Sequence, residues 1–492
     1  MSGLSSKKLI ILFLDICILI SLFLTMYILP ESYDFMLIYA TSIYIVLFAS
    51  WLTIKKDVLG YFFIFLILTY LYGFGQYFLN FFDMPIYSQY TINNVYTPLE
   101  INETAIYYLI NIVLLHFSVV IFDEYIGFHR KKNDIQVNSI INLNKIETTY
   151  EKSFNFVVLV VLAISFVCET LVLMSKIKIT LTQGYAASLA FEYGTQGFVA
   201  HIISFISTLF LPALFAALIT TKGKKSNIAV WLCYIVFLGM YFLSGSRFEA
   251  VISLAGVVIL YHNYYQKINI KKLLIVAIVG VAVLYLAALI NSIRIISAYG
   301  DAPDSFIKIL ELSINNTSKA GVIETVISTT GFQILANVAV YQNCPSEIDY
   351  SYGMYYLGGI ARVIPNFLGG ENPLITMGID GMFTKYLTKT YGMGSSFIIE
   401  AYYNFGVFGT LMMVPFGAGI AYLGNTIECI KKHKNVNVIL KFFVFYIVST
   451  TLFYPRSDAR MIVREIVFYY LGFVVATWVA KVLYNSNFRR RS

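Results

Sequence analysis

Long apolar runs separated by short polar connections dominate the chain. A helix of about 20 apolar residues can cross about 30 Å of hydrocarbon. Twelve such runs occur, at about 8–29, 33–54, 58–82, 104–123, 154–174, 198–221, 227–244, 248–263, 272–291, 397–424, 438–455 and 462–484. The pattern predicts an all-α polytopic integral membrane protein with about 12 transmembrane helices.

Two segments between these runs are too polar to span. Residues 175–197 are expected to lie at the membrane interface, and residues 292–396 form one long external loop. The loop has helix-like stretches, so it is predicted to be partly helical and to cap a site. The predicted division is therefore 1–291 for helices 1–9, 292–396 for the external loop, and 397–492 for helices 10–12 with a basic cytoplasmic tail.

Composition agrees with the membrane class. The chain is 58% hydrophobic and 13% charged, whereas soluble domains carry about 25% charged residues. Its five cysteines are scattered, which favours neither a disulfide framework nor a zinc site. The first apolar run follows a basic start and lacks a small-residue cleavage site, so we expect a retained helix rather than a removed signal peptide.

The lysines predict the orientation of the chain. They recur in alternate connections, at Lys7/Lys8, Lys55/Lys56, Lys131/Lys132, Lys222/Lys224/Lys225, Lys267/Lys271/Lys272 and Lys431/Lys432/Lys434. With twelve spans, all of these fall on one side of the membrane. Positive residues collect on the cytoplasmic side, so both termini are predicted to be cytoplasmic.

The arginines follow a different distribution. Four of the ten obey the positive-inside rule, whereas six fall at the predicted outer side: Arg247, Arg294, Arg362, Arg456, Arg460 and Arg464. Only six of the 25 lysines do so. The planar guanidinium group of arginine binds phosphate oxygens with two hydrogen bonds and keeps its positive charge. The six arginines are therefore predicted to bind one anionic group, such as a lipid pyrophosphate.

The last three arginines make the clearest case. Arg456, Arg460 and Arg464 recur every four residues, so they share one face of a helix within about 80°. Charges held near hydrocarbon usually face a polar cavity and mark a site. The alternative for any one of them alone is a structural salt bridge or an anchor at the membrane interface.

Three carboxylates near the same outer ends are candidate general bases: Glu400, Asp458 and Glu249. Beside arginines a carboxylate stays ionised, which suits proton abstraction or substrate orientation. Pairing with an arginine to hold the shape of the site is the equal alternative for Glu249 and Glu400. External tyrosines, namely Tyr402, Tyr403 and Tyr356, are candidates to stack on sugar faces.

The sequence predicts no cofactor and no metal. It contains no Asp-x-Asp, no paired metal-ligand spacing and no phosphate-binding glycine loop. These features argue against a metal-dependent transferase and against an ATP-driven pump. Nothing in the sequence indicates a nucleic-acid partner.

Four stretches together resemble the Wzy-type polymerases of oligosaccharide repeat units, which build O-antigen and capsule. The stretches are LSGSRFEA (243–250), SYGMYYLGGIARVIPNFLGG (351–370), YGMGSSFIIEAYYNFGVFG (391–409) and YPRSDARMIVRE (454–465). The resemblance covers roughly residues 150–480. The number of spans and the large late outer loop are similar too.

The resemblance implies a membrane glycosyltransferase with an architecture like that of O-antigen ligases (GT-C-like). Such an enzyme transfers a growing glycan from undecaprenyl pyrophosphate to a new lipid-linked repeat unit, without a metal, at the periplasmic face of the bacterial inner membrane. It also implies that Arg247, Arg362, Arg456 and Arg460 hold the donor pyrophosphate. Membrane lipid and a chain-length regulator are the further expected partners.

Three other classes remain open. The related O-antigen ligases rely on a histidine in the outer loop, and residues 292–396 contain none. A flippase or exporter of lipid-linked glycan needs polar groups across the whole bilayer, whereas here they gather at the outer side. A receptor or channel subunit has no specific feature in its favour. The polymerase is therefore the preferred prediction.

Overall fold

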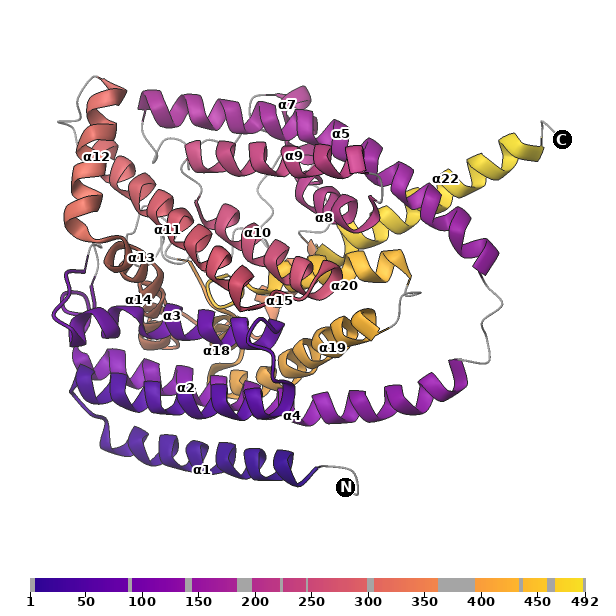
Figure 1. Ribbon diagram of the computed structural model, residues 1–492. Helices are drawn as coiled ribbons and strands as arrows, with labels where there is room; N and C mark the ends of the chain where they lie inside the picture. The colour runs from indigo at the N-terminus through magenta and orange to yellow at the C-terminus, as the bar shows by residue number, and fades with distance from the viewer. Residues whose placement is uncertain are drawn as a thin grey trace. The chain divides into compact units, whose positions relative to one another are not determined.

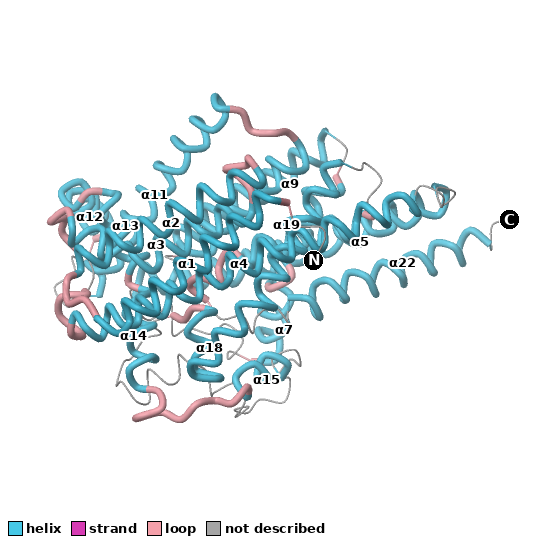
Figure 2. Tube along the Cα trace, turned by 90° about the horizontal axis from the view of Figure 1, so that it is seen from below, coloured by secondary structure: helices cyan, strands magenta, loops and turns pink. Residues whose placement is uncertain are grey.

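The structure, a computed structural model, describes residues 5–86, 91–137, 144–183, 197–221, 224–244, 247–298, 305–361, 394–432, 437–457 and 465–489. Over these ranges the chain forms helices joined by turns and contains no strand (Figures 1 and 2). The predicted all-α class is confirmed. The chain divides into two compact units: unit 1 holds 1–140, 327–432 and 450–464, and unit 2 holds 141–326, 433–449 and 465–492.

Each unit is built from helices that come from several parts of the chain. Unit 1 contains α1 (Ser6–Ile28), α2 (Tyr33–Lys55), α3 (Tyr61–Phe81), α4 (Pro98–Val137), α14 (Gln333–Asn343), α15 (Met354–Ala361), α18 (Phe397–Phe405), the 3₁₀ segment η3 (Gly406–Met412) and α19 (Met413–Lys432). Unit 2 contains α5 (Asn144–Gln183), α7 (Phe198–Ser207), α8 (Phe210–Thr220), α9 (Lys224–Leu243), α10 (Arg247–Leu260), the π-helical η2 (Tyr261–Tyr265), α11 (Ile270–Ala298), α12 (Phe306–Ala320), the π-helical η4 (Glu465–Leu471) and α22 (Gly472–Arg489). Two helices, α13 (Val322–Gly331) and α20 (Val438–Thr451), have residues in both units.

Eight helical segments of the described chain are long and apolar enough to cross a membrane. They are Ser6–Ile28, Tyr33–Lys55, Tyr61–Phe81, Pro98–Gly127, Glu151–Thr180, Phe198–Thr220, Ser226–Leu243 and Phe397–Lys432. All eight coincide with predicted spans, so the chain is a multi-pass membrane protein. The other four predicted spans contain α10, α11, α20 and η4/α22, and the total of about twelve stays a prediction.

The predicted outer loop contains regular structure. Within 292–396 the chain forms α12, α13, α14 and α15, in agreement with the helix-like stretches read from the sequence. At the other polar segment, α5 continues to Gln183, nine residues past the predicted end of the fifth span. The division at 291 and 396 describes position relative to the membrane and stays a prediction.

Glycines allow close helix contacts in unit 1. A Cβ built at Gly331 of α13 would lie 2.4 Å from the Gln76 backbone nitrogen of α3. One built at Gly417 of α19 would lie 2.5 Å from Ser118 Cβ of α4. Neither distance leaves room for a methyl group. Small residues at such crossings let helix backbones approach closely, which is how membrane helices gain packing energy.

One end of unit 1 is fastened by ion pairs between four helices. Lys8 Nζ lies 2.8 Å from Asp123 Oδ2, and Lys55 Nζ lies 2.7 Å from Asp123 Oδ1. Glu124 pairs with Lys8 at 2.7 Å, and Glu428 pairs with Lys55 at 2.8 Å. The two lysines that the sequence placed on one side of the membrane therefore lie at one end of unit 1.

A second polar contact joins α1, α2 and α4 inside the helix bundle. His116 Nδ1 lies 2.9 Å from Asp15 Oδ2, and His116 Nε2 lies 3.0 Å from Ser50 Oγ. The three side chains are buried. The Ser50 hydroxyl also donates to the Leu47 carbonyl oxygen at 2.8 Å. The arrangement satisfies both nitrogens of a buried imidazole, which stabilises the packing of the three helices.

Unit 2 is organised around the long helix α5, which packs against α7, α8, α9 and α22. Aromatic rings form part of its core: the Phe154 ring lies 6.2 Å from Phe442 and 6.1 Å from Phe473 between centroids. Gly256 of α10 approaches α20, since a Cβ built there would lie 2.4 Å from Ser449 Cβ.

Candidate active site

The short helix α18 carries the first of the predicted bases. Ser396 caps its N-terminus, because the Ser396 side chain accepts a hydrogen bond from the Ile399 N–H at 3.2 Å. Gly394, two residues earlier, has φ +78°, a value that side chains with a Cβ rarely adopt. The helix ends at Gly406, with φ +58°. Glycines thus bound a helix of nine residues.

Glu400 lies on the buried face of this helix and is 0% exposed. Ser396, Glu400 and Asn404 follow one another every four residues, so they lie on one side of α18. Asn404 Nδ2 donates to the Glu400 carbonyl oxygen at 2.8 Å, and Ser396 Oγ donates to Asn337 Oδ1 at 2.9 Å. The helix therefore presents a carboxylate within a row of polar side chains.

The facing helix α14 adds two amides with the same spacing, Gln333 and Asn337, each 2% exposed. Neither polar atom of the Gln333 amide has a hydrogen-bond partner among the described residues, and the same holds for Asn337 Nδ2. In the described chain Asn404 Oδ1 and Ser395 Oγ lack partners as well. These groups, with Ser396 and Glu400, are called the polar cluster below.

The polar cluster lowers the stability of the fold. A buried polar group without a hydrogen bond costs about 1–3 kcal/mol, and the cluster holds several. A polyhydroxylated ligand supplies both donors and acceptors, so it could satisfy amide groups of both kinds. The cluster therefore has the chemistry of a site for sugar hydroxyls.

The arginine-bearing stretch 454–457 begins next to α18. The Phe397 N–H donates to the Tyr454 carbonyl oxygen at 3.1 Å, and the Arg456 N–H closes a turn on the Phe453 carbonyl oxygen at 2.8 Å. A Cβ built at Gly394 would lie 3.0 Å from Gln333 Oε1 and 3.5 Å from the Arg456 carbonyl oxygen. The backbone of Arg456 therefore lies beside the polar cluster, and its side chain is half-buried.

The other predicted site residues fall into two groups. Arg362, Asp458, Arg460 and Arg464 lie outside the described residues. Arg247 and Glu249 belong to the first turn of α10, and Arg294 belongs to α11, all in unit 2. The structure thus brings Glu400 and the Arg456 backbone together with the polar cluster. For the remaining arginines and acids the predicted roles stay predictions.

The predicted sugar-stacking tyrosines have distinct surroundings. Tyr402 is 7% exposed, and its ring packs 5.2 Å from Tyr107 and 4.7 Å from Tyr341. Its hydroxyl donates to the Cys344 carbonyl oxygen at 3.1 Å. Tyr403 and Tyr356 are half-buried. Tyr402 holds α4, α14 and α18 together, and glycan stacking by the three stays a prediction.

Two titratable groups beside the site keep their protons. The pKa of Tyr341 is raised well above its usual range, mainly by burial and to a lesser extent by the negative charge of Glu103. The phenol therefore keeps its proton and donates a hydrogen bond to Glu103 Oε1 at 3.4 Å. Burial, followed by Asp349, raises the pKa of the Cys344 thiol to about 12. A neutral thiol is a poor nucleophile, so Cys344 is a packing residue. Among the described residues no group of His, Cys, Asp and Glu could hold a metal ion.

Sequence reasoning singled out Glu400 and Arg456 as candidates, which they remain, and did not single out the amides of the polar cluster. A signal was present, because Gln333 and Asn337 interrupt an apolar stretch one helical turn apart, and Ser396 and Asn404 flank Glu400 at the same spacing. Polar residues that share one face of an apolar helix mark a buried polar surface.

Together, the fold and this site define a multi-pass helical membrane protein with a carboxylate and unmet hydrogen-bonding groups inside its helix bundle. The family described as O-antigen polysaccharide polymerase Wzy matches residues 10–487, nearly the whole chain. The chain belongs to this family, and the resemblance read from four short stretches is confirmed. No curated protein matches the chain. No solved structure matches it.

Proposed function

We propose that the chain polymerises oligosaccharide repeat units carried on undecaprenyl pyrophosphate, at the outer leaflet of the bacterial inner membrane. Membership of the Wzy family supports a polymerising glycosyltransferase that acts on lipid-linked oligosaccharide. The single observation that carries the site is the fully buried Glu400 on α18, within the polar cluster whose Gln333 lies near the Arg456 backbone.

In this proposal the polar cluster binds the acceptor sugar. The amides of Gln333, Asn337 and Asn404 have free donors and acceptors within the described chain, and sugar hydroxyls would occupy them. Bound in this way, one acceptor hydroxyl is directed at Glu400. Positioning of this kind lowers the barrier because the reacting groups no longer have to find one another.

The proposed step exchanges one bond at the anomeric carbon of the donor. The bond to the pyrophosphate oxygen breaks, and a bond to the acceptor oxygen forms. The acceptor hydroxyl gives its proton to Glu400, and the lipid pyrophosphate leaves with the electron pair. Arg456, together with Arg460 and Arg464, offsets the negative charge that develops on the leaving group. Asp458 and Glu249 remain the alternative bases.

The wider setting follows from the same proposal. Arg247, Arg294 and Arg362 are proposed to complete the binding of the pyrophosphate, and Tyr402, Tyr403 and Tyr356 to contact the glycan. Both termini are proposed to be cytoplasmic, with the site open to the periplasm. The reaction is proposed to need no metal. A chain-length regulator is the expected protein partner.

The test uses the purified full-length protein and a synthetic lipid-linked repeat unit. The wild-type protein should produce a ladder of longer glycans. Glu400→Gln keeps the size of the side chain and removes the base, so turnover should fall about 10²- to 10⁴-fold. Arg456→Ala should slow the reaction, and Arg456→Lys should restore only part of it, because lysine lacks the fork.

The matched control is Glu428→Gln. Glu428 pairs with Lys55 at the fastened end of unit 1, and its loss should leave the ladder unchanged. A full ladder from Glu400→Gln would move the base to Asp458 or Glu249, to be tested as Asp458→Asn and Glu249→Gln. No ladder from the wild-type protein, combined with movement of the lipid across vesicles, would identify a flippase instead.

A further inference from the structure

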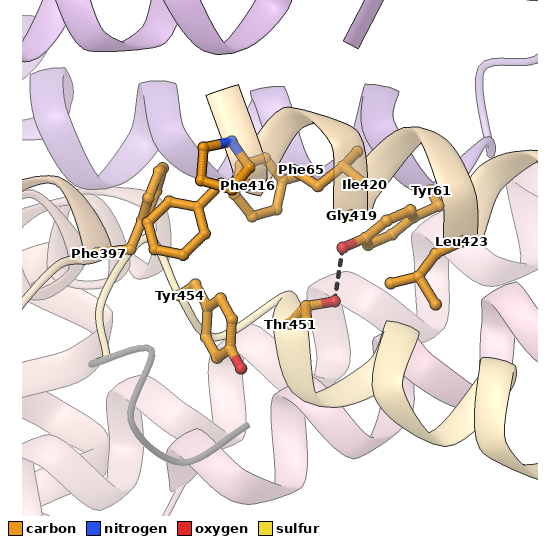
Figure 3. Close-up of a pocket in the computed structure, with 10 residues that line it drawn as sticks. Tyr61, Phe65, Phe397, Phe416, Gly419, Ile420, Leu423, Thr451 and Tyr454 are labelled. Carbon is orange, nitrogen blue, oxygen red and sulfur yellow. Dashed lines mark hydrogen bonds between the residues drawn. The ribbon is translucent and has the colours of Figure 1, made fainter. Parts of the chain in front are cut away.

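A cavity of about 120 Å³ lies in unit 1 beside α18. Four segments line it, namely the start of α3, the start of α18, the first half of α19 and residues 451–454. Along α19 the lining residues are Pro415, Phe416, Gly419, Ile420 and Leu423, which form a stripe about 12 Å long. Figure 3 shows the rings of Phe397, Phe416 and Tyr454 gathered at one end of the cavity and Tyr61 with Leu423 at the other.

The lining is apolar. Among the described lining residues, only Tyr61, Thr451 and Tyr454 carry hydroxyl groups. The hydroxyls of Tyr61 and Thr451 hydrogen-bond to each other at 2.6 Å (Figure 3). That bond satisfies one hydroxyl hydrogen of the pair within the protein. The remaining surface suits a hydrocarbon chain.

The cavity adjoins the candidate active site. Phe397 and Tyr454 line it, and their backbones are joined by the 3.1 Å hydrogen bond at the start of α18. Arg456 follows Tyr454 by two residues, and Glu400 follows Phe397 by three. A molecule whose charged head lies at Arg456 could therefore place its tail in this cavity.

The cavity also lies along the apolar segment Phe397–Lys432, which is long enough to cross a membrane, and two of its lining residues are exposed. Lys431 pairs with Asp57 at the fastened end of unit 1. Gly419 lies about 18 Å from Lys431 along α19 at about 1.5 Å per residue, well within about 30 Å of hydrocarbon. Gly419 and Pro415 are exposed, so a lipid chain could enter between them from the bilayer.

We propose that this cavity binds the first isoprene units of the polyprenyl tail of the lipid-linked donor. The tail then lies along α19 while the pyrophosphate is held at Arg456, and the two contacts fix the anomeric carbon next to Glu400. The inference rests on the proposed function, since it takes the donor to be a polyprenyl-linked glycan. An apolar lining accepts either kind of chain, and the position of the cavity beside residues 454–456 favours the tail of a pyrophosphate-linked lipid over the acyl chain of a bulk phospholipid.

Two glycines of α19 provide a matched pair of variants. A Cβ built at Gly419 meets no atom within 4 Å, and the same is true at Gly424. Only Gly419 lines the cavity. Gly419→Leu therefore fills the cavity, whereas Gly424→Leu adds the same side chain elsewhere on the helix. Leucine favours a helix more than glycine does, so both variants should fold. Ile420→Phe narrows the cavity from the neighbouring position as a second variant.

The experiment uses the full-length protein in lipid nanodiscs. One probe is a lipid-linked repeat unit with a photoreactive group on the isoprene nearest the pyrophosphate, and the other is a phospholipid with the same group in its acyl chain. The prenyl probe should label residues 415–423, and Gly419→Leu should reduce that labelling about tenfold. Because bilayer hydrocarbon is as apolar as the cavity, tail binding gains packing alone, and the KM for the donor should rise only about three- to tenfold. Gly424→Leu should change neither value.

The outcomes separate the two proposals. Equal labelling by the phospholipid probe, or equal labelling of the Gly419→Leu and Gly424→Leu variants, would overturn the tail site. A glycan ladder with no labelling of residues 415–423 would overturn it too and leave the polymerase intact. Specific labelling without any ladder from the wild-type protein would keep the tail site and reject the polymerase.

Discussion

Replacing Gln333 by methionine should raise the free energy of unfolding of the protein and lower its catalytic efficiency. Both polar atoms of the Gln333 amide lack a hydrogen-bond partner in the described chain, and the residue is 2% exposed. Methionine has nearly the same length and shape, so Gln333→Met removes the unmet polar atoms without opening a cavity. A buried polar group without a partner costs about 1–3 kcal/mol, and the free energy of unfolding should rise by about that amount.

The effect on catalysis should have the opposite sign. If Gln333 binds the acceptor sugar, the methionine variant loses two hydrogen bonds, each worth about 0.5–1.5 kcal/mol. The sum, about 1–3 kcal/mol, corresponds to a fall in kcat/KM of about 5- to 150-fold. Thermal or denaturant unfolding in detergent measures the first effect, and the rate of glycan elongation measures the second.

A glutamine on the same helix supplies the control. Gln342 Nε2 donates to the Glu100 carbonyl oxygen at 3.3 Å and to Glu103 Oε2 at 3.2 Å. Gln342→Met breaks two bonds that are already made, so it should lower stability by about 1–3 kcal/mol and leave elongation unchanged. If Gln333→Met destabilised the protein as Gln342→Met does, the amide of Gln333 would have hydrogen-bond partners after all, and this account of it would be wrong. Added stability with full activity would remove Gln333 from the acceptor site.

Three further predictions concern packing and charge in unit 1. Asp15→Leu leaves a buried nitrogen of His116 without its partner and should cost about 1–3 kcal/mol of stability. In a double-mutant cycle, adding His116→Leu should recover part of this loss. Gly331→Ala places a methyl group 2.4 Å from the Gln76 nitrogen and should cost about 1–3 kcal/mol by overpacking. The control Gly239→Ala, which meets no atom within 4 Å, should not lower the melting temperature. Asp123→Asn should destabilise more than Glu124→Gln, because Asp123 pairs with two lysines and Glu124 with one; an inverted order of melting temperatures would contradict this account.

The helices that cross the membrane were predictable because lipid imposes one simple demand, a long run of apolar side chains with all backbone hydrogen bonds made inside the helix. The eight spans from Ser6–Ile28 to Phe397–Lys432 meet that demand within single segments of sequence. Lysine placement also predicted that Lys8 and Lys55 lie at the same end. The carboxylate that joins them, Asp123, could not be chosen from the sequence, since several acids lie close to the same predicted side.

The candidate site likewise contains residues that the sequence singled out and residues that only the structure revealed. Glu400 and Arg456 could be singled out because a charge at the end of an apolar span is costly and therefore informative. The importance of Gln333 and Asn337 depends on α14 facing α18, and that pairing joins segments about 60 residues apart in the chain. The apolar cavity could not be predicted from the sequence for a different reason. Its walls are ordinary membrane residues such as Phe416 and Leu423, and only their arrangement distinguishes them from the rest.

The ion pairs at the fastened end of unit 1 also have an order in time. Lys8 and Lys55 leave the ribosome before Asp123, and long before Glu428. During insertion the two lysines are therefore unpaired positive charges, free to orient the first helices. Once α4 and α19 arrive, the same charges become buried or half-buried links between four helices. The same two side chains thus serve first as a signal during biosynthesis and later as links between helices, which form with α4 and are completed by Glu428 of α19.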